Sequence, residues 1–216
     1  MQTVPAALGR RVVMAILATI PPALVAAGVI FGIQYWSAHS GVPFQQRALI
    51  VTSPFDARGS LSLNGTVVWR AVDGKDGAAI VADLTIPVEG THVVLTFRKN
   101  TDQSLPASHL IEVAASALSG SRAGPVAKIG NLLAKPSPDD KGTPLIGSVV
   151  DVTDTLFWIA LSPLSLDTNA NLRLLAMSQF FGLQITYASG MSANITFEKG
   201  HTGNAVFQKV MTAWGI

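Results

Sequence analysis

The chain has 216 residues, a formal net charge of +2 and no cysteine. Disulfide bonds, thiolate catalysis and zinc sites built on cysteine are therefore excluded. The 15 basic residues are scattered along the sequence, so they predict no nucleic-acid partner, which would require Lys and Arg gathered on one face. Only 13% of the residues are charged and 49% are hydrophobic, and a membrane segment would account for part of this imbalance.

A run without charge covers residues 12–33, VVMAILATIPPALVAAGVIFGI. As a helix this run would be about 33 Å long, which matches a hydrocarbon core about 30 Å thick. Residues 12–34 are therefore predicted to form one transmembrane helix, between an N-terminus at 1–11 and a linker at 35–45. Residues 46–216 would then form a domain outside the bilayer.

The residues that flank the run predict its orientation. Arg10 and Arg11 precede it, and Tyr35 and Trp36 follow it at the depth where amphipathic rings occupy the opposite interface. Because positive charge is retained on the cytoplasmic side, we expect a cytoplasmic N-terminus and an exported C-terminal domain.

Two other interpretations of the run stay open. Ala38, His39 and Ser40 form a small-x-small site that a signal peptidase could cleave, although signal peptides usually have a shorter apolar region. The run could also be a buried helix of a soluble core, although such helices rarely run this long without a charge. Pro21 and Pro22 fall in mid-span, where they indicate either a tolerated kink or a neighbouring helix that satisfies the freed carbonyls.

Alternating apolar and polar residues follow the linker and predict antiparallel strands with one buried face. The alternation covers residues 66–71, 80–86 and 93–98, and turn sequences separate these segments at 73–77 and 89–90. A further strand is expected at 109–115. Between 117 and 143, Gly, Ser, Pro and charged residues dominate around a short apolar stretch at 126–133, which predicts a long surface excursion that could include one helical turn.

The second half is more hydrophobic and predicts strands at 145–152 and 156–161, the second covered on both faces. A helix capped by Asp167 or Thr168 is expected to run to about Phe180, with Leu172 and Leu175 among its inward residues. Residues 181–188 and 193–198 predict a hairpin.

A last helix is predicted at 203–214, because its apolar residues recur at helical spacing. The fold class expected is therefore α+β: a transmembrane helix followed by a mainly antiparallel β-sheet domain with two or three packed helices. The inward face of the last helix would comprise Val206, Phe207, Val210, Met211 and Trp214.

The densest polar stretch, residues 98–109, provides the candidate site. In a functional interpretation, Arg98, Asp102 and His109 lie at the rim of a cleft and bind an anionic group or a partner peptide. In a structural interpretation, a strand ends here, Asp102 bonds backbone amides in a turn, and Ser108 and His109 begin the next strand. We favour the structural interpretation.

Motifs for catalysis, metal binding and cofactor binding are not found. The four histidines form no i, i+4 pair and no HExxH, so no metal site is predicted. The sequence contains no GxSxG elbow, P-loop or dinucleotide fingerprint, so it predicts neither a catalytic residue nor a cofactor.

Several stretches resemble a group of uncharacterised alphaproteobacterial proteins that carry a transmembrane segment before a C-terminal domain. The resemblance implies a bacterial inner-membrane setting, with the C-terminal domain in the periplasm, and it implies no activity. The stretches are GTVVWRA at 65–71, FRKNTDQSLPASH at 97–109, GTPLIGSVVDVTDTLFWIALS at 142–162, NLRLL at 171–175 and FEKGHTGNAVFQKVMTAW at 197–214.

These patterns favour a membrane-anchored, non-enzymatic accessory or assembly subunit that makes protein contacts on the periplasmic side of the inner membrane. Its expected partners are the lipid bilayer and an envelope or membrane protein. One alternative is a periplasmic ligand-binding domain with the 117–143 loop as a lid. Another is an envelope hydrolase without a recognisable motif.

Overall fold

The computed structural model describes residues 46–52, 61–74, 76–118, 121 and 123–216. The predicted transmembrane helix at 12–34, with its flanking residues Arg10, Arg11, Tyr35 and Trp36, and the linker lie outside these residues. In the described ranges no helix is long and apolar enough to cross a membrane.

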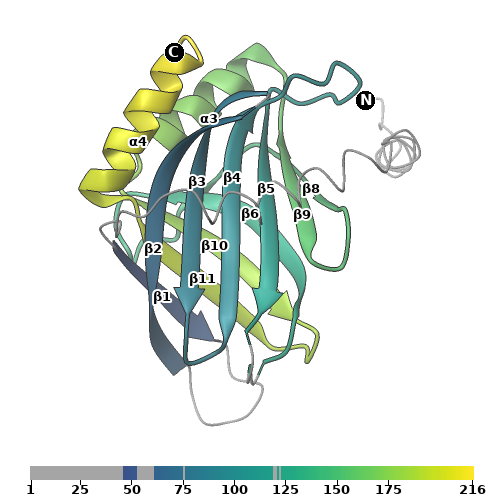
Figure 1. Ribbon diagram of the computed structural model, residues 1–216, viewed down its shortest axis with the longest axis vertical. Helices are drawn as coiled ribbons and strands as arrows, with labels where there is room; N and C mark the ends of the chain where they lie inside the picture. Colours follow the sequence, from purple (N-terminus) through teal and green to yellow (C-terminus); the bar gives the residue numbers. More distant parts are fainter. Residues whose placement is uncertain (1–45, 53–60, 75, 119–120, 122) are drawn as a thin grey trace, which may run out of the picture. The chain divides into compact units, whose positions relative to one another are not determined.

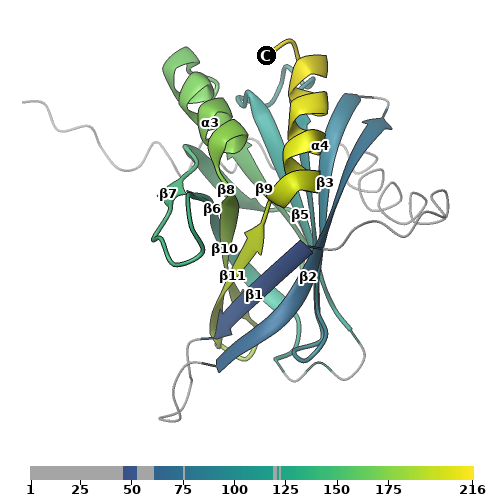
Figure 2. The ribbon, with the colours of Figure 1, turned by 90° about the vertical axis from the view of Figure 1, so that its left-hand side faces the viewer.

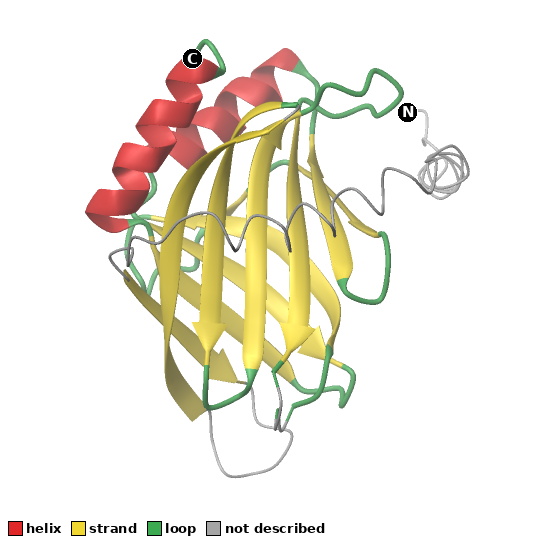
Figure 3. Cartoon of the chain, in the orientation of Figure 1, coloured by secondary structure: helices red, strands yellow, loops and turns green. Residues whose placement is uncertain are grey.

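Strands make up most of the described chain (Figure 3), and all of their pairings are antiparallel. They form one 11-stranded sheet in the order β7-β6-β10-β11-β1-β2-β3-β4-β5-β9-β8. The sheet curls (Figure 1), and β6, next to one edge, contacts β8 and β9 at the other edge. The strands are β1 Gln46–Thr52, β2 Leu61–Gly74, β3 Gly77–Ile86, β4 Thr91–Lys99, β5 His109–Ala117, β6 Val126–Lys135, β7 Thr143–Pro144, β8 Gly147–Asp151, β9 Leu156–Leu161, β10 Phe180–Tyr187 and β11 Ser192–Glu198.

Two helices, α3 Ser165–Met177 and α4 Gly200–Ala213, lie together at one end of the curled sheet (Figure 2). α4 packs on β2, β3 and α3. It approaches β2 so closely that a Cβ added to Gly203 would lie 3.1 Å from ring atoms of Trp69. The structure therefore confirms the α+β class, with a mainly antiparallel sheet and two packed helices in the described part.

The alternation of side chains explains the strands in the middle of the sheet. Along β4, fully buried residues alternate with half-buried ones, and the predicted segments 66–71, 80–86 and 93–98 lie in β2, β3 and β4. The strands predicted at 109–115 and 156–161 and the hairpin at 181–198 are also confirmed. Because one face of β2, β3 and β4 turns to the core, their period of two was visible in the sequence. β9 is instead buried on both faces, as its uninterrupted apolar run predicted.

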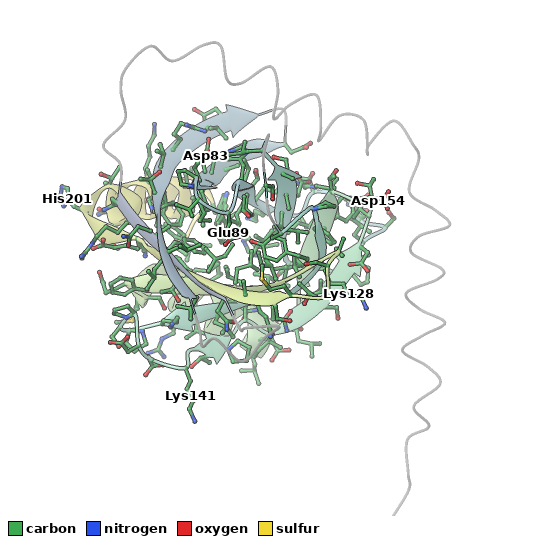
Figure 4. All side chains as sticks on the ribbon, turned by 90° about the horizontal axis from the view of Figure 1, so that it is seen from below. Asp83, Glu89, Lys128, Lys141, Asp154 and His201 are labelled. Carbon is green, nitrogen blue, oxygen red and sulfur yellow. The ribbon has the colours of Figure 1, made fainter. Side chains whose placement is uncertain are left out.

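Aromatic rings fill the space that the strands enclose. The Trp69 ring of β2 lies 5.4–6.4 Å from four phenylalanine rings, and its indole nitrogen donates to the Glu198 carbonyl at 2.8 Å. Seen from the end opposite the helices (Figure 4), side chains occupy the middle of the barrel-like sheet, while Lys141 extends away from it. The four rings around Trp69 are Phe97, Phe181, Phe197 and Phe207.

The predicted surface excursion at 117–143 is wrong. Its centre is β6, ten residues long, which pairs with β10 inside the sheet, so the segment cannot move as a single lid. The pairing with β10 shifts register between Leu183 and Ile185, where Gly130 lies against Gln184. Such a bulge interrupts the alternation of side chains, which is why the sequence pattern did not indicate a strand.

The boundaries of α3 also differ from the prediction. Leu164, rather than Asp167 or Thr168, is the N-cap residue, and no side chain caps the helix there. The helix ends at Met177, and Phe180 begins β10 instead of extending the helix. The apolar side chain of Phe180 suits a strand as well as a helix, so it could not mark the boundary.

Candidate functional site

The predicted site at 98–109 is divided between two faces of the sheet. Residues 98 and 99 are neighbours on β4, and Lys99 is the residue paired with His109 of β5. Because consecutive side chains of a strand point to opposite faces, Arg98 lies on the opposite face from His109. The structure therefore does not bring Arg98 and His109 together at the rim of one cleft.

Arg98 forms an ion pair on the outer face of the sheet. Its Nε and Nη2 atoms donate to Oε1 of Glu112 on β5, at 3.0 and 2.9 Å. Both side chains are about four-fifths covered, so the pair is more than a solvated surface contact. Arg98 is thus already paired and has little freedom to bind an anion.

Asp102 belongs to a tight loop between β4 and β5. Its Oδ1 atom accepts hydrogen bonds from the Ser104 amide at 2.9 Å and from the Ser104 hydroxyl at 2.6 Å. These two bonds, with a smaller effect of the Arg98 charge, lower the pKa of Asp102 below its ordinary value. The side-chain amide of Asn100 closes the loop, because its Nδ2 atom donates to three backbone carbonyl groups. The structural interpretation of this stretch is confirmed for Asp102.

His109 begins β5, as predicted, but it lies inside the domain rather than at a rim. The residue is 5% exposed, its ring centroid lies 4.9 Å from that of Trp214, and neither ring nitrogen has a hydrogen-bond partner. Burial, and to a smaller extent the Lys99 charge, lowers the pKa of His109 to about 4. Lys99 itself donates to the Trp214 carbonyl at 3.1 Å. His109 is therefore neutral at pH 7.

A second polar cluster, absent from the sequence prediction, lies on the outer face of β2–β4. Asp83 accepts a hydrogen bond from Arg70 at 2.9 Å and contacts the His92 ring at 2.8 Å. Burial alone would raise the pKa of Asp83, but the bonds and charges of His92 and Arg70 outweigh it and lower the pKa. Each member has a partner within the cluster, which is what a structural ion-pair network requires.

Lys199, between β11 and α4, is a buried cation. It is 1% exposed, and its Nζ donates to the carbonyls of Leu175 and Ala176 at 2.9 and 2.7 Å. The same Nζ lies 4.3 Å from the centre of the Phe207 ring. Burial lowers the pKa of Lys199 to about 8. The ammonium group thus satisfies carbonyls at the C-terminal end of α3, where a positive charge is favourable.

The edge of the sheet at β8, part of which lies against β6 in the curled sheet, is the first feature with binding capacity. In the described part of the chain, β9 is the one strand that pairs with β8. At the two ends of this ladder the Ser162 amide donates to the Ile146 carbonyl, and the Val152 amide donates to the Leu156 carbonyl, both at 2.9 Å. Antiparallel ladders alternate between bonded and non-bonded pairs, so the even-numbered residues of β8 are the ones bonded to β9.

The odd-numbered residues of β8 consequently point their backbone groups away from β9. These residues are Gly147, Val149 and Asp151, and no ladder joins them to another strand among the described residues. Beside this edge, Val149 packs partly against the core, and Val150 is paired with Trp158 on the opposite face. The edge therefore offers backbone donors and acceptors between two apolar surfaces.

The outward face of α3 is the second exposed feature. Leu166 is 85% exposed and Met177 is 72% exposed, and Leu164 just before the helix is 66% exposed. These values are the three highest among the large hydrophobic residues that the structure describes. Apolar side chains exposed together in this way mark contact surfaces more often than isolated ones do.

The described ranges contain no group of three or more His, Asp or Glu side chains that could hold a metal ion. The sequence pattern did not indicate Lys199, the β8 edge or the outward face of α3 as features of interest, because each depends on how distant segments pack. No protein-family model, curated protein or solved structure matches this chain. The geometry of these features is what the functional proposal rests on.

Proposed function

We propose that this protein is a membrane-anchored, non-enzymatic accessory or assembly subunit that contacts another envelope protein on the periplasmic side of a bacterial inner membrane. The uncharged run at 12–33 and the preceding Arg10 and Arg11 support the anchor and its orientation. The observation that carries the protein contact is the edge of β8. An extended segment of the partner would pair with β8 as an added strand.

The composition of β8 supports this role. Proteins usually protect exposed edges with Lys, Pro or a bulge, since an unprotected edge pairs with other chains. The opposite edge of the sheet has such protection, because β7 contains Pro144, and β6 beside it contains Lys128 and the bulge against β10. β8 reads GSVVD and contains neither Lys nor Pro.

The test uses a photo-crosslinking residue at Ser148 in the full chain, expressed in its native membrane. A discrete adduct is expected from this position, and none is expected from the same residue placed at Asn64, which is exposed on β2. The adduct should disappear in a Val149→Pro background, because proline removes the outward N–H. It should persist with Val149→Ala, which keeps that N–H.

Two results would count against the proposal. An adduct that survives Val149→Pro, in a protein whose circular dichroism is unchanged, would show that the partner does not pair with the β8 edge. Release of the chain from membranes by alkaline carbonate would show that residues 12–34 do not anchor it. Either outcome removes one half of the proposal and leaves the other half to be judged by its own experiment.

A further inference from the structure

α3 has apolar side chains on two opposite sides. On the inward side, Leu172 and Leu175 are buried in the core. On the outward side, Leu166 and Met177 are separated by 11 positions, which is about three turns, so both lie on one stripe of the helix. Large apolar side chains exposed on one stripe of a helix mark a surface that another molecule covers. The described chain covers the inward side of α3.

The C-terminal end of α3 lies next to the point where the described domain begins. With its amide oriented to satisfy both neighbours, Gln46 donates to the Lys199 carbonyl at 2.6 Å and accepts from the His201 amide at 3.2 Å. Lys199 in turn donates to the Ala176 carbonyl at 2.7 Å, one residue before Met177. Gln46 and the exposed end of α3 therefore belong to the same region of the surface.

The length of chain before Gln46 limits how far this region can be from the bilayer. If residues 12–34 span the membrane, the linker at 35–45 can extend over at most about 40 Å. α3 is about 20 Å long, so its C-terminal end stays within reach of the membrane surface. The linker holds α3 within reach of lipid, whereas it does not hold α3 near any protein partner. The length of the linker therefore favours lipid as the cover of α3.

The charges in this region suit a phospholipid surface. Arg173 is exposed on the outward stripe between Leu166 and Met177. The Arg47 side chain, 89% exposed, lies on the strand that begins at Gln46 and forms an ion pair with Glu198 at 3.5 Å. An exposed cation flanked by apolar side chains matches lipid phosphates above acyl chains. The acidic Asp167 of α3 is already bound by the Ser162 hydroxyl at 2.7 Å.

We propose that α3 lies on the periplasmic surface of the bilayer, with Leu166 and Met177 inserted among the lipids and Arg173 at the phosphates. The inference rests on the proposed membrane anchor, and it adds an orientation for the domain. With α3 on the membrane, lipid covers the second apolar side of the helix.

The test exploits the absence of cysteine from the chain. Single cysteines at Leu166 and Met177 are labelled with an environment-sensitive fluorophore in the full chain, reconstituted in phospholipid vesicles. Asp154→Cys serves as the control, because Asp154 is exposed and lies on the opposite side of the domain from His201 (Figure 4). Labels at 166 and 177 should shift to shorter emission wavelengths and lose most of their emission when the vesicles contain nitroxide-labelled lipid. Iodide, a quencher that stays in the water, is added in a parallel measurement. The label at 154 should be quenched by iodide and not by the nitroxide-labelled lipid.

The other outcomes overturn the inference in distinguishable ways. If carbonate does not extract the chain and the labels at 166 and 177 respond to iodide but not to nitroxide lipid, α3 faces water and the anchor alone stands. If these labels respond to neither quencher, a protein covers α3. If carbonate extracts the chain, the membrane anchor itself fails, and with it the reason for placing α3 on lipid.

Discussion

Among single residues, His109 is one whose protonation is opposed by burial in the fold. Its pKa is about 4 in the folded chain and near 6.5 in an unfolded one, so the folded state binds fewer protons between these values. We therefore expect the free energy of unfolding to fall by up to about 3 kcal/mol as the pH drops from 6.5 toward 4. Urea unfolding of the full chain at several pH values, followed by circular dichroism, measures this loss.

The control for this prediction is His109→Phe, which keeps a ring against Trp214 but has no titratable group. The variant should lose less stability over the same pH range, and at pH 7 it should be at least as stable as the native chain, because two unpartnered nitrogens have been removed. An equal loss of stability in both proteins would show that other groups cause the acid sensitivity.

Lys199 should change the stability of the protein at alkaline pH, whereas His109 does so at acidic pH. Burial lowers its pKa from 10.5 to about 8, so between these values the unfolded chain binds more protons than the folded one. The difference in unfolding free energy between the native chain and Lys199→Met should therefore grow in favour of the native chain by up to about 3 kcal/mol from pH 8 to 10.5. The raised pKa of Tyr187 acts in the same range, but both proteins contain Tyr187 and the difference removes its effect. A difference that stays constant with pH would contradict the prediction.

At the scale of elements, Asn171 joins α3 to the edge of the sheet. Its Oδ1 accepts from the Ile146 amide at 2.7 Å, and its Nδ2 donates to the Ile146 carbonyl at 2.8 Å, just before β8. Asn171→Leu removes the acceptor of the Ile146 amide and leaves this amide without a partner. The Ile146 carbonyl keeps one partner, since it still accepts from the Ser162 amide. We expect a loss of about 2 kcal/mol in unfolding free energy and faster hydrogen exchange in β8.

A matched control exists on the same helix, since Asn169 is exposed. Asn169→Leu should change stability by less than about 0.5 kcal/mol and leave exchange in β8 unaltered. Similar effects of both substitutions would mean that the helix itself, and not its bond to Ile146, determines the stability of this edge.

The same elements show which parts of the fold the sequence could reveal. Strands β2 to β4 have one face in the core, so side-chain alternation identified them. β6 escaped notice because a bulge opposite Gln184 interrupts the alternation, and its Gly130 and Lys128 are typical of loops. The end of α3 was placed too late, because Phe180 is as suitable for the start of a strand.

At the scale of the whole molecule, the candidate site was harder to predict than the fold. The sequence placed Arg98 and His109 eleven positions apart in one polar stretch, but strand alternation sends them to opposite faces. The burial of His109 depends on Trp214, which reaches it from the far end of the chain. No local pattern encodes such a contact, whereas the turn at Asp102 is local and was predicted.

Phe207 tests whether the domain unfolds as one unit. Its ring lies 5.4 Å from that of Trp69 on β2, 5.7 Å from that of Phe97 on β4 and 5.7 Å from that of Phe181 on β10. Because α4 thereby joins strands from both halves of the sheet, Phe207→Ala should lower the unfolding free energy by about 3–5 kcal/mol. Tryptophan fluorescence and far-ultraviolet circular dichroism should report the same shifted transition.

The control is Val88→Ala, at a position that is 58% exposed in the turn between β3 and β4, and it should change stability by less than about 0.5 kcal/mol. If the fluorescence transition of Phe207→Ala moves while the dichroism transition does not, α4 separates from a sheet that stays folded. The aromatic rings would then hold the helix without being needed by the strands. Coincident transitions would instead show that the eleven strands and α4 share one cooperative core.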